Sequence, residues 1–227
     1  MIPLRDTIPT RSVPFVNNLL IAANVLGFLL ELAQGARLDE FLNAFAYVPA
    51  RLFRGGDLGH DLLTIVTAMF LHGGLGHLIG NLLYLWIFGD NVEDALGHGR
   101  YLVFYLACGF AATLTQTLFF PRSEVPNIGA SGAIAGALGG YFLLYPRARV
   151  VTLVPLFFLF PLIEIPAGLY LFFWFLMQFL MGGSALASAQ RGGGVAWWAH
   201  VGGFLAGLVL VKLMQPRRRP AVGYTIR

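Results

Sequence analysis

Residues 129–145 read GASGAIAGALGGYFLLY, an apolar run that carries no charged residue. Within it, glycine recurs at every fourth position, at Gly132, Gly136 and Gly140. On a helix this spacing produces one smooth face that a neighbouring helix can approach closely. The run is therefore typical of a helix packed inside a membrane, and we expect a span over residues 131–145.

The composition of the whole chain also points to a membrane. Of its 227 residues, 57% are hydrophobic and 11% are charged, whereas a soluble domain has about 25% charged residues. A domain of this size cannot hide so many apolar side chains in a core, so the composition excludes a soluble globular protein. The basic residues behind the net charge of +4 are scattered at segment ends, apart from Arg217, Arg218 and Arg219. They indicate membrane topology rather than a nucleic-acid surface.

Hydropathy divides the chain into six predicted spans. They cover residues 15–32, 77–92, 101–120, 131–145, 166–181 and 196–214. We therefore expect an all-α polytopic membrane protein with a six-helix membrane domain over residues 15–214. Residues 1–14 are predicted to be a cytoplasmic N-terminal tail without a cleavable signal, and residues 215–227 a basic cytoplasmic tail.

The distribution of Lys and Arg predicts the orientation in the membrane. An even number of spans puts both termini on one side. That side holds ten of the 15 Lys and Arg residues, and the opposite side holds five. Because cytoplasmic loops are enriched in Lys and Arg, we expect both termini in the cytoplasm.

Two segments between the spans have mixed composition. In the first loop, apolar residues such as Phe41 stand beside charges such as Asp39, which predicts an amphipathic segment in the membrane interface. Three prolines interrupt the long apolar run over residues 150–181. They predict a short interfacial stretch before the fifth helix.

Among the polar side chains inside the predicted spans, four stand out: His77, Asn81, Ser131 and His200. Such groups are costly in lipid and mark a functional site by default. Ser131 begins the fourth span, where free backbone N–H groups and the helix dipole favour a developing negative charge. A helix-capping serine framed by packing glycines is the alternative that this short motif leaves open.

His200 shares one stripe of the sixth span with Gly203 and Gly207, three and seven residues further on. If this stripe packs against the glycines of the fourth span, His200 comes next to Ser131 and can accept its hydroxyl proton. A packing histidine, hydrogen-bonded across helices, is the alternative.

His77 and Asn81 lie one helical turn apart, hence on one face of the second span. Two neutral donors suit an oxyanion hole, together with the Ser131 backbone N–H and the adjacent Gly129. A structural hydrogen-bonded pair is the alternative. No carboxylate has an obvious position to orient His200, so the pattern predicts a Ser–His dyad. The lone Cys108 and the lack of an HExxH sequence give no metal signature, and we expect no metal or other cofactor.

Taken in order along the chain, these residues resemble the rhomboid intramembrane serine proteases, over nearly the whole chain. The residues that carry the resemblance are His77, Asn81, the GASG sequence over residues 129–132, Ala199, His200, Gly203 and Gly207. A run similar to the family's structural signature joins the second and third spans: Gly89, Glu93, Gly97 and Tyr105.

The resemblance implies a six-helix bundle that cleaves transmembrane or membrane-proximal segments of other membrane proteins, without a metal. In it, Ser131 is the nucleophile, His200 is the general base, and His77 and Asn81 help to stabilise the oxyanion. The implied partners are transmembrane protein substrates and membrane lipids, not nucleic acid. The compact core suits a bacterial inner membrane.

Two positions depart from the family pattern. Ala135 stands where better-known bacterial members carry a large aromatic residue that packs on the catalytic histidine, so we expect another group beside His200. Leu63-Thr64 stands where the first loop of many members carries Trp-Arg.

Two other functions stay open at this point. One is a catalytically silent rhomboid-like protein that binds or chaperones membrane clients, although such relatives typically lose the serine or the histidine. The other is a small transporter or channel, but the chain has no recognisable inverted repeat.

Overall fold

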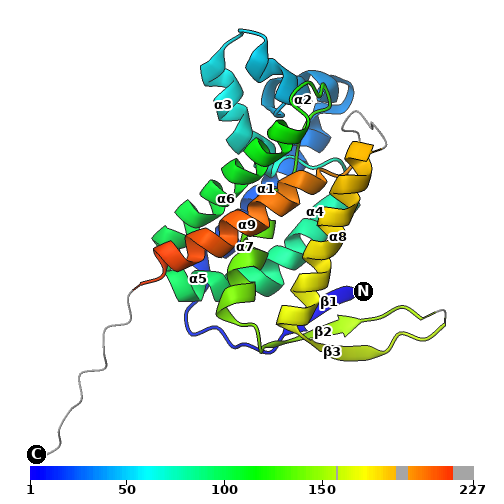
Figure 1. Ribbon diagram of the computed structural model, residues 1–227. Helices are drawn as coiled ribbons and strands as arrows, with labels where there is room; N and C mark the ends of the chain where they lie inside the picture. Colours follow the sequence, from blue (N-terminus) through cyan, green and yellow to red (C-terminus); the bar gives the residue numbers. More distant parts are fainter. Residues whose placement is uncertain (157, 188–193, 217–227) are drawn as a thin grey trace, which may run out of the picture.

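The computed structural model describes residues 1–156, 158–187 and 194–216, and it confirms the predicted bundle of six apolar helices (Figure 1). In chain order the bundle helices are α1 (Phe15–Gln34), α4 (Leu75–Tyr84) continued by the π-helical turn η4 (Leu85–Gly89) and α5 (Asp90–Leu96), α6 (His98–Phe119), α7 (Ser131–Leu144), α8 (Ala167–Ala187) and α9 (Trp197–Met214). The first residues of α1 and the last of α9 lie at the same end of the bundle (Figure 1).

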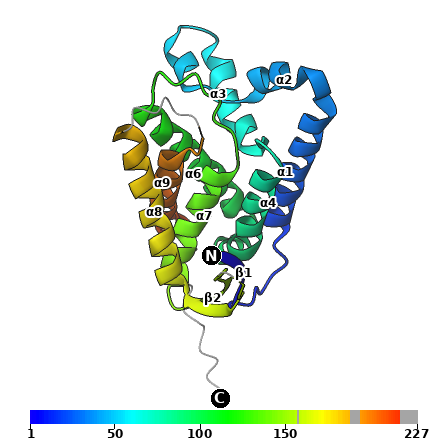
Figure 2. The ribbon, with the colours of Figure 1, turned by 90° about the vertical axis from the view of Figure 1, so that its right-hand side faces the viewer.

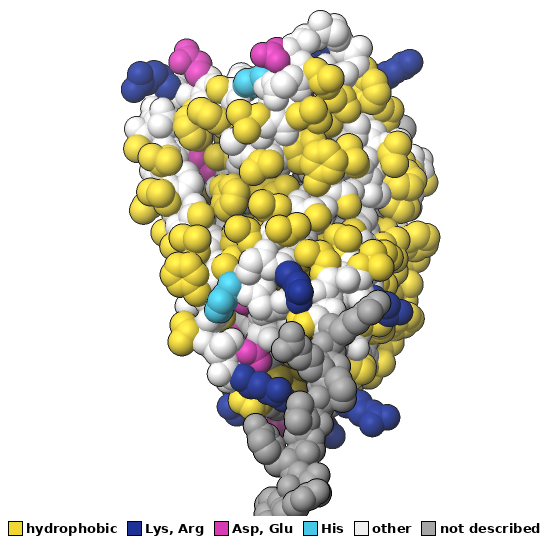
Figure 3. Space-filling model, turned by 90° about the vertical axis from the view of Figure 1, so that its left-hand side faces the viewer, with side chains coloured by type: hydrophobic (Ala, Val, Ile, Leu, Met, Phe, Trp, Pro, Cys, Tyr) yellow, Lys and Arg dark blue, Asp and Glu magenta, His cyan; other side chains and the backbone are white. Residues whose placement is uncertain are grey.

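The surface of the bundle has the pattern of a protein that sits in a bilayer. Figure 3 shows hydrophobic side chains in a broad band around the middle, with most charged side chains toward the two ends. Among the residues that the structure describes, four helical segments are each long and apolar enough to cross a bilayer. The bent pair formed by Leu58–Phe70 and Leu75–Leu96 makes a fifth if it is counted as one span. The chain is therefore a multi-pass integral membrane protein.

Helix α7, at the centre of the bundle, is apolar but too short to span a membrane by itself. Its 14 residues rise about 21 Å at about 1.5 Å per residue, less than the roughly 30 Å of a hydrocarbon core. The residues from Gly132 to Tyr141 are all buried, because α6, α8 and α9 pack around α7 (Figure 2). The first residue of α7, Ser131, consequently lies within the bundle rather than on its outer surface.

Helices α7 and α9 touch through their backbones. A Cβ atom added at Gly203 would lie 2.0 Å from the carbonyl oxygen of Gly132. One added at Gly207 would lie 2.0 Å from the carbonyl oxygen of Gly136. No side chain fits at either position of α9, so glycine is what allows the two helices to approach this closely.

The three regularly spaced glycines of α7 face mainly α6. Added Cβ atoms at Gly132, Gly136 and Gly140 would first meet α6 side chains, at 2.6 Å from Ala112, 2.3 Å from Cys108 and 3.2 Å from Phe104. Close approach to the α9 backbone instead involves Gly139, where an added Cβ would lie 2.2 Å from the Phe204 carbonyl oxygen. The four-residue spacing did not predict Gly139.

The segment that joins the second and third bundle helices holds the start of α1 in place. The predicted structural signature runs through this segment into α6 and consists of Gly89, Glu93, Gly97 and Tyr105. The Glu93 carboxylate accepts hydrogen bonds from the backbone N–H groups of Val16 (2.9 Å) and Asn17 (2.7 Å). These N–H groups lie in the first turn of α1, where a helix offers them no partner of its own. Gly97 takes a φ of 79° at the junction of α5 and α6, and Tyr105 is fully buried in α6.

Residues between α1 and α4 form a layer of short helices at one end of the bundle (Figure 1). They are η1 (Gly35–Arg37), α2 (Leu38–Phe45), η2 (Pro49–Phe53), α3 (Leu58–Thr67) and η3 (Ala68–Phe70). Apolar side chains such as Phe53, Leu58 and Leu63 are exposed on this layer. Its mixture of exposed apolar groups and charges corresponds to the predicted interfacial first loop.

A three-stranded antiparallel sheet at the other end of the bundle corrects the all-α prediction. Strand β2 (Arg149–Leu153) pairs with β1 (Ile2–Asp6) on one side and with β3 (Leu162–Pro166) on the other. The β-branched residues of β2 favour a strand, and prolines exclude a helix between β2 and α8.

The sheet also changes the predicted boundaries of the membrane domain. Strand β1 lies within residues 1–14, so this segment is not a free tail. The Asp6 carboxylate fastens it to the bundle, because it accepts hydrogen bonds from the Tyr141 hydroxyl and from Asn91 Nδ2. Of the predicted C-terminal tail, only Gln215 and Pro216 fall within the described residues.

Replacement of Gly207 by alanine tests the backbone contact between α7 and α9. The added methyl group would meet the α7 backbone, which cannot rotate away, so we expect a loss of about 1–3 kcal/mol of stability and a lower melting temperature in detergent. Gly183→Ala on α8 is the matched control, because nothing lies within 4 Å of its added Cβ. Equal melting temperatures for the two variants would contradict the contact.

Candidate active site

Helices α7 and α9 bring two of the predicted site residues into contact. Ser131 Oγ lies 2.8 Å from His200 Nε2. Ser131 is the first residue of α7, and Ala130 occupies the cap position, so the serine is not the helix cap. His200 is buried in the first turn of α9. The pair has the arrangement of a hydroxyl nucleophile beside its base.

The second bundle helix brings His77 and Asn81 to the same cavity as Ser131. The backbone N–H of Gly73 donates to His77 Nδ1 at 3.3 Å. A neutral His77 ring therefore carries its proton on Nε2. Asn81 Nδ2 is buried, and among the described residues it has no hydrogen-bond partner. Both N–H groups are donors suited to a developing negative charge.

The absence of a side chain at Gly129 leaves room for the His77 ring. The φ of Gly129 is 120°, a conformation that other residues rarely adopt. A Cβ atom at this position would also lie 2.8 Å from His77 Nε2 and Cε1. A glycine two residues before Ser131 is thus needed for both the loop and the ring beside it.

His72, in the loop before α4, packs edge-on against His77 with ring centroids 5.1 Å apart. Burial, aided by the neighbouring His77, lowers the pKa of His72 to about 4. The His72 ring is therefore neutral near pH 7 and places no cation beside the His77 ring.

Helix α8 supplies two site residues that the sequence did not reveal. Gln178 Oε1 lies 2.8 Å from His200 Nδ1, and the Trp174 ring lies 5.9 Å from the imidazole between centroids. Trp197 is edge-on to the same imidazole at 6.3 Å. Ala135 itself is fully buried in α7, and the two tryptophans are the other groups that lie beside His200. The available signal for Gln178 was its position as the one amide in the apolar run of α8.

A cavity of about 670 Å³ opens onto these residues. Its polar lining includes His77, Asn81, Asn127, Ser131, Gln178 and His200, and much of the remaining wall is apolar. Its volume lies within the roughly 300–1,000 Å³ of typical ligand sites. The cavity extends between α4 and α8. The Tyr84 hydroxyl of α4 and the Tyr170 hydroxyl of α8 are hydrogen-bonded at 2.8 Å and link the two helices.

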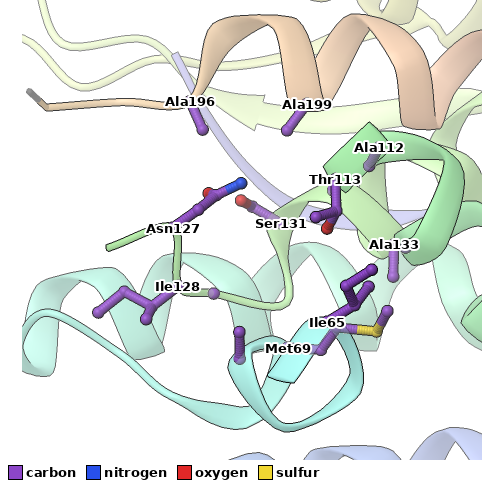
Figure 4. A pocket seen from close by; sticks show the side chains of 14 residues that line it. Ile65, Met69, Ala112, Thr113, Asn127, Ile128, Ser131, Ala133, Ala196 and Ala199 are labelled. Atoms are coloured by element: carbon purple, nitrogen blue, oxygen red, sulfur yellow. The ribbon is translucent and has the colours of Figure 1, made fainter. Parts of the chain in front are cut away.

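A second cavity of about 20 Å³ adjoins Ser131 from the side of α6 and η3 (Figure 4). In this view the side chains of Asn127 and Ser131 approach each other, and Thr113 lies beyond Ser131. The cavity has room for about one water molecule and offers it polar neighbours.

The geometry defines a class: a polytopic membrane protein whose helix bundle buries a serine–histidine pair, two neutral donors and a mainly apolar cavity. Within the described ranges, no three His, Cys, Asp or Glu side chains are grouped so that they could hold a metal ion.

Comparison with known proteins identifies the family. The family model for the Rhomboid domain matches residues 59–217, more than half of the chain, so the chain belongs to the rhomboid family. "Rhomboid protease GluP" of Bacillus subtilis is 39% identical over 133 residues, which are 58% of this chain and 24% of that protein. "Rhomboid protein 1, mitochondrial" of Saccharomyces cerevisiae is 30% identical over 173 residues, which are 71% of this chain and 46% of that protein. The chain spans less than half the length of either relative.

Proposed function

We propose that this chain is an intramembrane serine endopeptidase that cleaves transmembrane or membrane-proximal segments of other membrane proteins. The observation that carries the proposal is the 2.8 Å contact between Ser131 Oγ and His200 Nε2 at a cavity inside the bundle. Asn81 Nδ2, a buried donor with no hydrogen-bond partner in the described part of the chain, supports it.

In the first half of the reaction, Ser131 Oγ attacks the carbonyl carbon of the scissile peptide bond. His200 Nε2 takes the hydroxyl proton and then delivers it to the nitrogen of the leaving peptide. Asn81 Nδ2–H, His77 Nε2–H and the Ser131 backbone N–H stabilise the tetrahedral oxyanion. The products of this half are an acyl ester on Ser131 and a free amine.

In the second half, water hydrolyses the ester. His200 accepts a proton from the water as its oxygen attacks the acyl carbon, and then returns that proton to Ser131 Oγ. The small cavity beside Ser131 is suited to hold this water close to the ester. The cycle releases a carboxylic acid and restores the serine.

The cavity between α4 and α8 suits a peptide segment that enters from the lipid, because both helices border its largely apolar wall. We place the protein in a bacterial inner membrane with both termini cytoplasmic. The excess of Lys and Arg on the side of the termini and the relative in Bacillus subtilis support this location.

A catalytically silent client-binding protein is the second candidate. It would use the same cavity but would not need a hydroxyl held against an imidazole. The retained Ser131 and His200, and their contact, favour the protease.

Cleavage of a transmembrane reporter in liposomes tests the proposal. We expect the wild type to cut the reporter and both Ser131→Ala and His200→Ala to lose at least about 10³-fold in rate, because the nucleophile and base act as a unit. Cooperative thermal unfolding of both variants serves as the control that they are folded. If the folded wild type cuts neither the reporter nor any of a panel of other membrane-spanning substrates, the result would favour the client-binding protein.

Asn81→Ala separates the oxyanion donors from the nucleophile. Loss of one donor while the others remain should lower kcat by about 10²–10³, with residual activity above that of Ser131→Ala. Leu75→Ala, an exposed residue at the start of the same helix, is the control for changes in α4. An Asn81→Ala enzyme with wild-type kcat would remove Asn81 from the oxyanion site.

A further inference from the structure

Gln178 contacts His200 on the side of the imidazole away from Ser131. Gln178 is 3% exposed, and its Oε1 lies 2.8 Å from His200 Nδ1. We propose that Gln178 is a positioning residue that holds His200 in the tautomer able to accept the Ser131 proton. The inference rests on the proposed protease function and adds a third member to the predicted dyad.

The orientation of the Gln178 amide follows from its own hydrogen bonds. Gln178 Nε2 donates to the backbone carbonyl oxygen of Trp174 at 3.3 Å. That carbonyl oxygen can only accept, so the amide nitrogen must point toward Trp174 and the amide oxygen toward His200. A flipped amide would set two acceptor oxygens against each other at Trp174.

This orientation determines the tautomer of His200. An amide oxygen is only an acceptor, so the neutral imidazole must carry its proton on Nδ1 to make the contact. The lone pair on Nε2 then faces Ser131 Oγ, as a general base requires. In the other tautomer Nε2 would bear a proton, and the ring could not take the serine proton.

An amide performs this task without a net charge. A carboxylate at the same position would also accept from Nδ1–H, but it would favour the imidazolium and keep His200 protonated to higher pH. An ionised side chain inside a membrane bundle is also costly. Glutamine thus selects the tautomer while it leaves His200 neutral and ready to act as a base.

The arrangement makes the base depend on the position of α8. Trp174 and Gln178, one turn apart on α8, supply the ring and the amide that contact His200. One turn further, the Gly182 carbonyl oxygen accepts a hydrogen bond from Trp198 Nε1 of α9 at 3.1 Å. Only 22% of the most apolar stretch of α8 is buried, against 50% for α9. The contact between Gln178 and His200 therefore joins the base to the less embedded of these two helices.

Kinetics of Gln178→Met and Gln178→Glu test the inference. Methionine keeps the length of the side chain but cannot accept from Nδ1–H, so kcat should fall about 10- to 100-fold with little change in KM. Glutamate restores the acceptor, so kcat at alkaline pH should return to within a few-fold of wild type. The acid limb of the pH profile should then move to higher pH, because the carboxylate stabilises the imidazolium.

Gln116 provides the matched control. It is also a buried glutamine, and its Oε1 accepts from the backbone N–H of Ala199, next to His200, at 3.2 Å. Gln116→Met should lower the melting temperature without a comparable loss of kcat. If both methionine variants lose kcat equally, or if Gln178→Glu behaves like Gln178→Met with no shift of the acid limb, Gln178 has only a structural role.

¹⁵N NMR of protein labelled with ¹⁵N-histidine measures the tautomer of His200 independently of catalytic activity. The His200 signals are assigned by their loss in His200→Ala. We expect a protonated Nδ1 in the wild type and a mixture of tautomers in Gln178→Met. An unchanged tautomer in Gln178→Met overturns the inference. A wild type that holds this tautomer but cleaves no substrate would instead count against the proposed function alone.

Discussion

The close backbone contact between α7 and α9 is the constraint on which the site depends. Gly203 and Gly207 lie against the carbonyl oxygens of Gly132 and Gly136, and this contact sets the distance and register of the two helices. The Ser131–His200 contact lies just beyond it, at the first turn of both helices. A side chain at either α9 glycine would separate the helices and lengthen the distance between the serine and the imidazole.

The same contact explains how polar chemistry fits inside an apolar bundle. Helix α7 is short and is buried along most of its length, so its N-terminus ends among other helices instead of at the membrane surface. The free N–H groups at that terminus, the His77 ring and the Asn81 amide then meet in one cavity. Each of these groups is a neutral donor, so the site concentrates hydrogen-bond donors without burying a net charge.

Sequence patterns predicted the helical membrane fold because span length and apolar composition are local properties. The adjacency of α7 and α9 was also predicted from glycine spacing, and Gly203 and Gly207 do lie against the α7 backbone. The regularly spaced glycines of α7 were expected to face α9 as well, but they face mainly α6. The sheet was missed because β1 and β2 are separated by more than 140 residues, and their pairing leaves no local periodicity. Gln178 was missed for a similar reason: one amide in an apolar run shows that a partner exists, but only the packing of α8 against α9 shows that the partner is His200.

The central claim is that His200 activates Ser131 as a nucleophile. Peptide mass mapping after treatment with a fluorophosphonate measures this directly, because the probe phosphonylates only an activated serine. We predict a single adduct on Ser131 in the folded wild type and almost none in folded His200→Ala. Equal labelling of Ser131 in both proteins, or labelling of a different serine, would contradict the account.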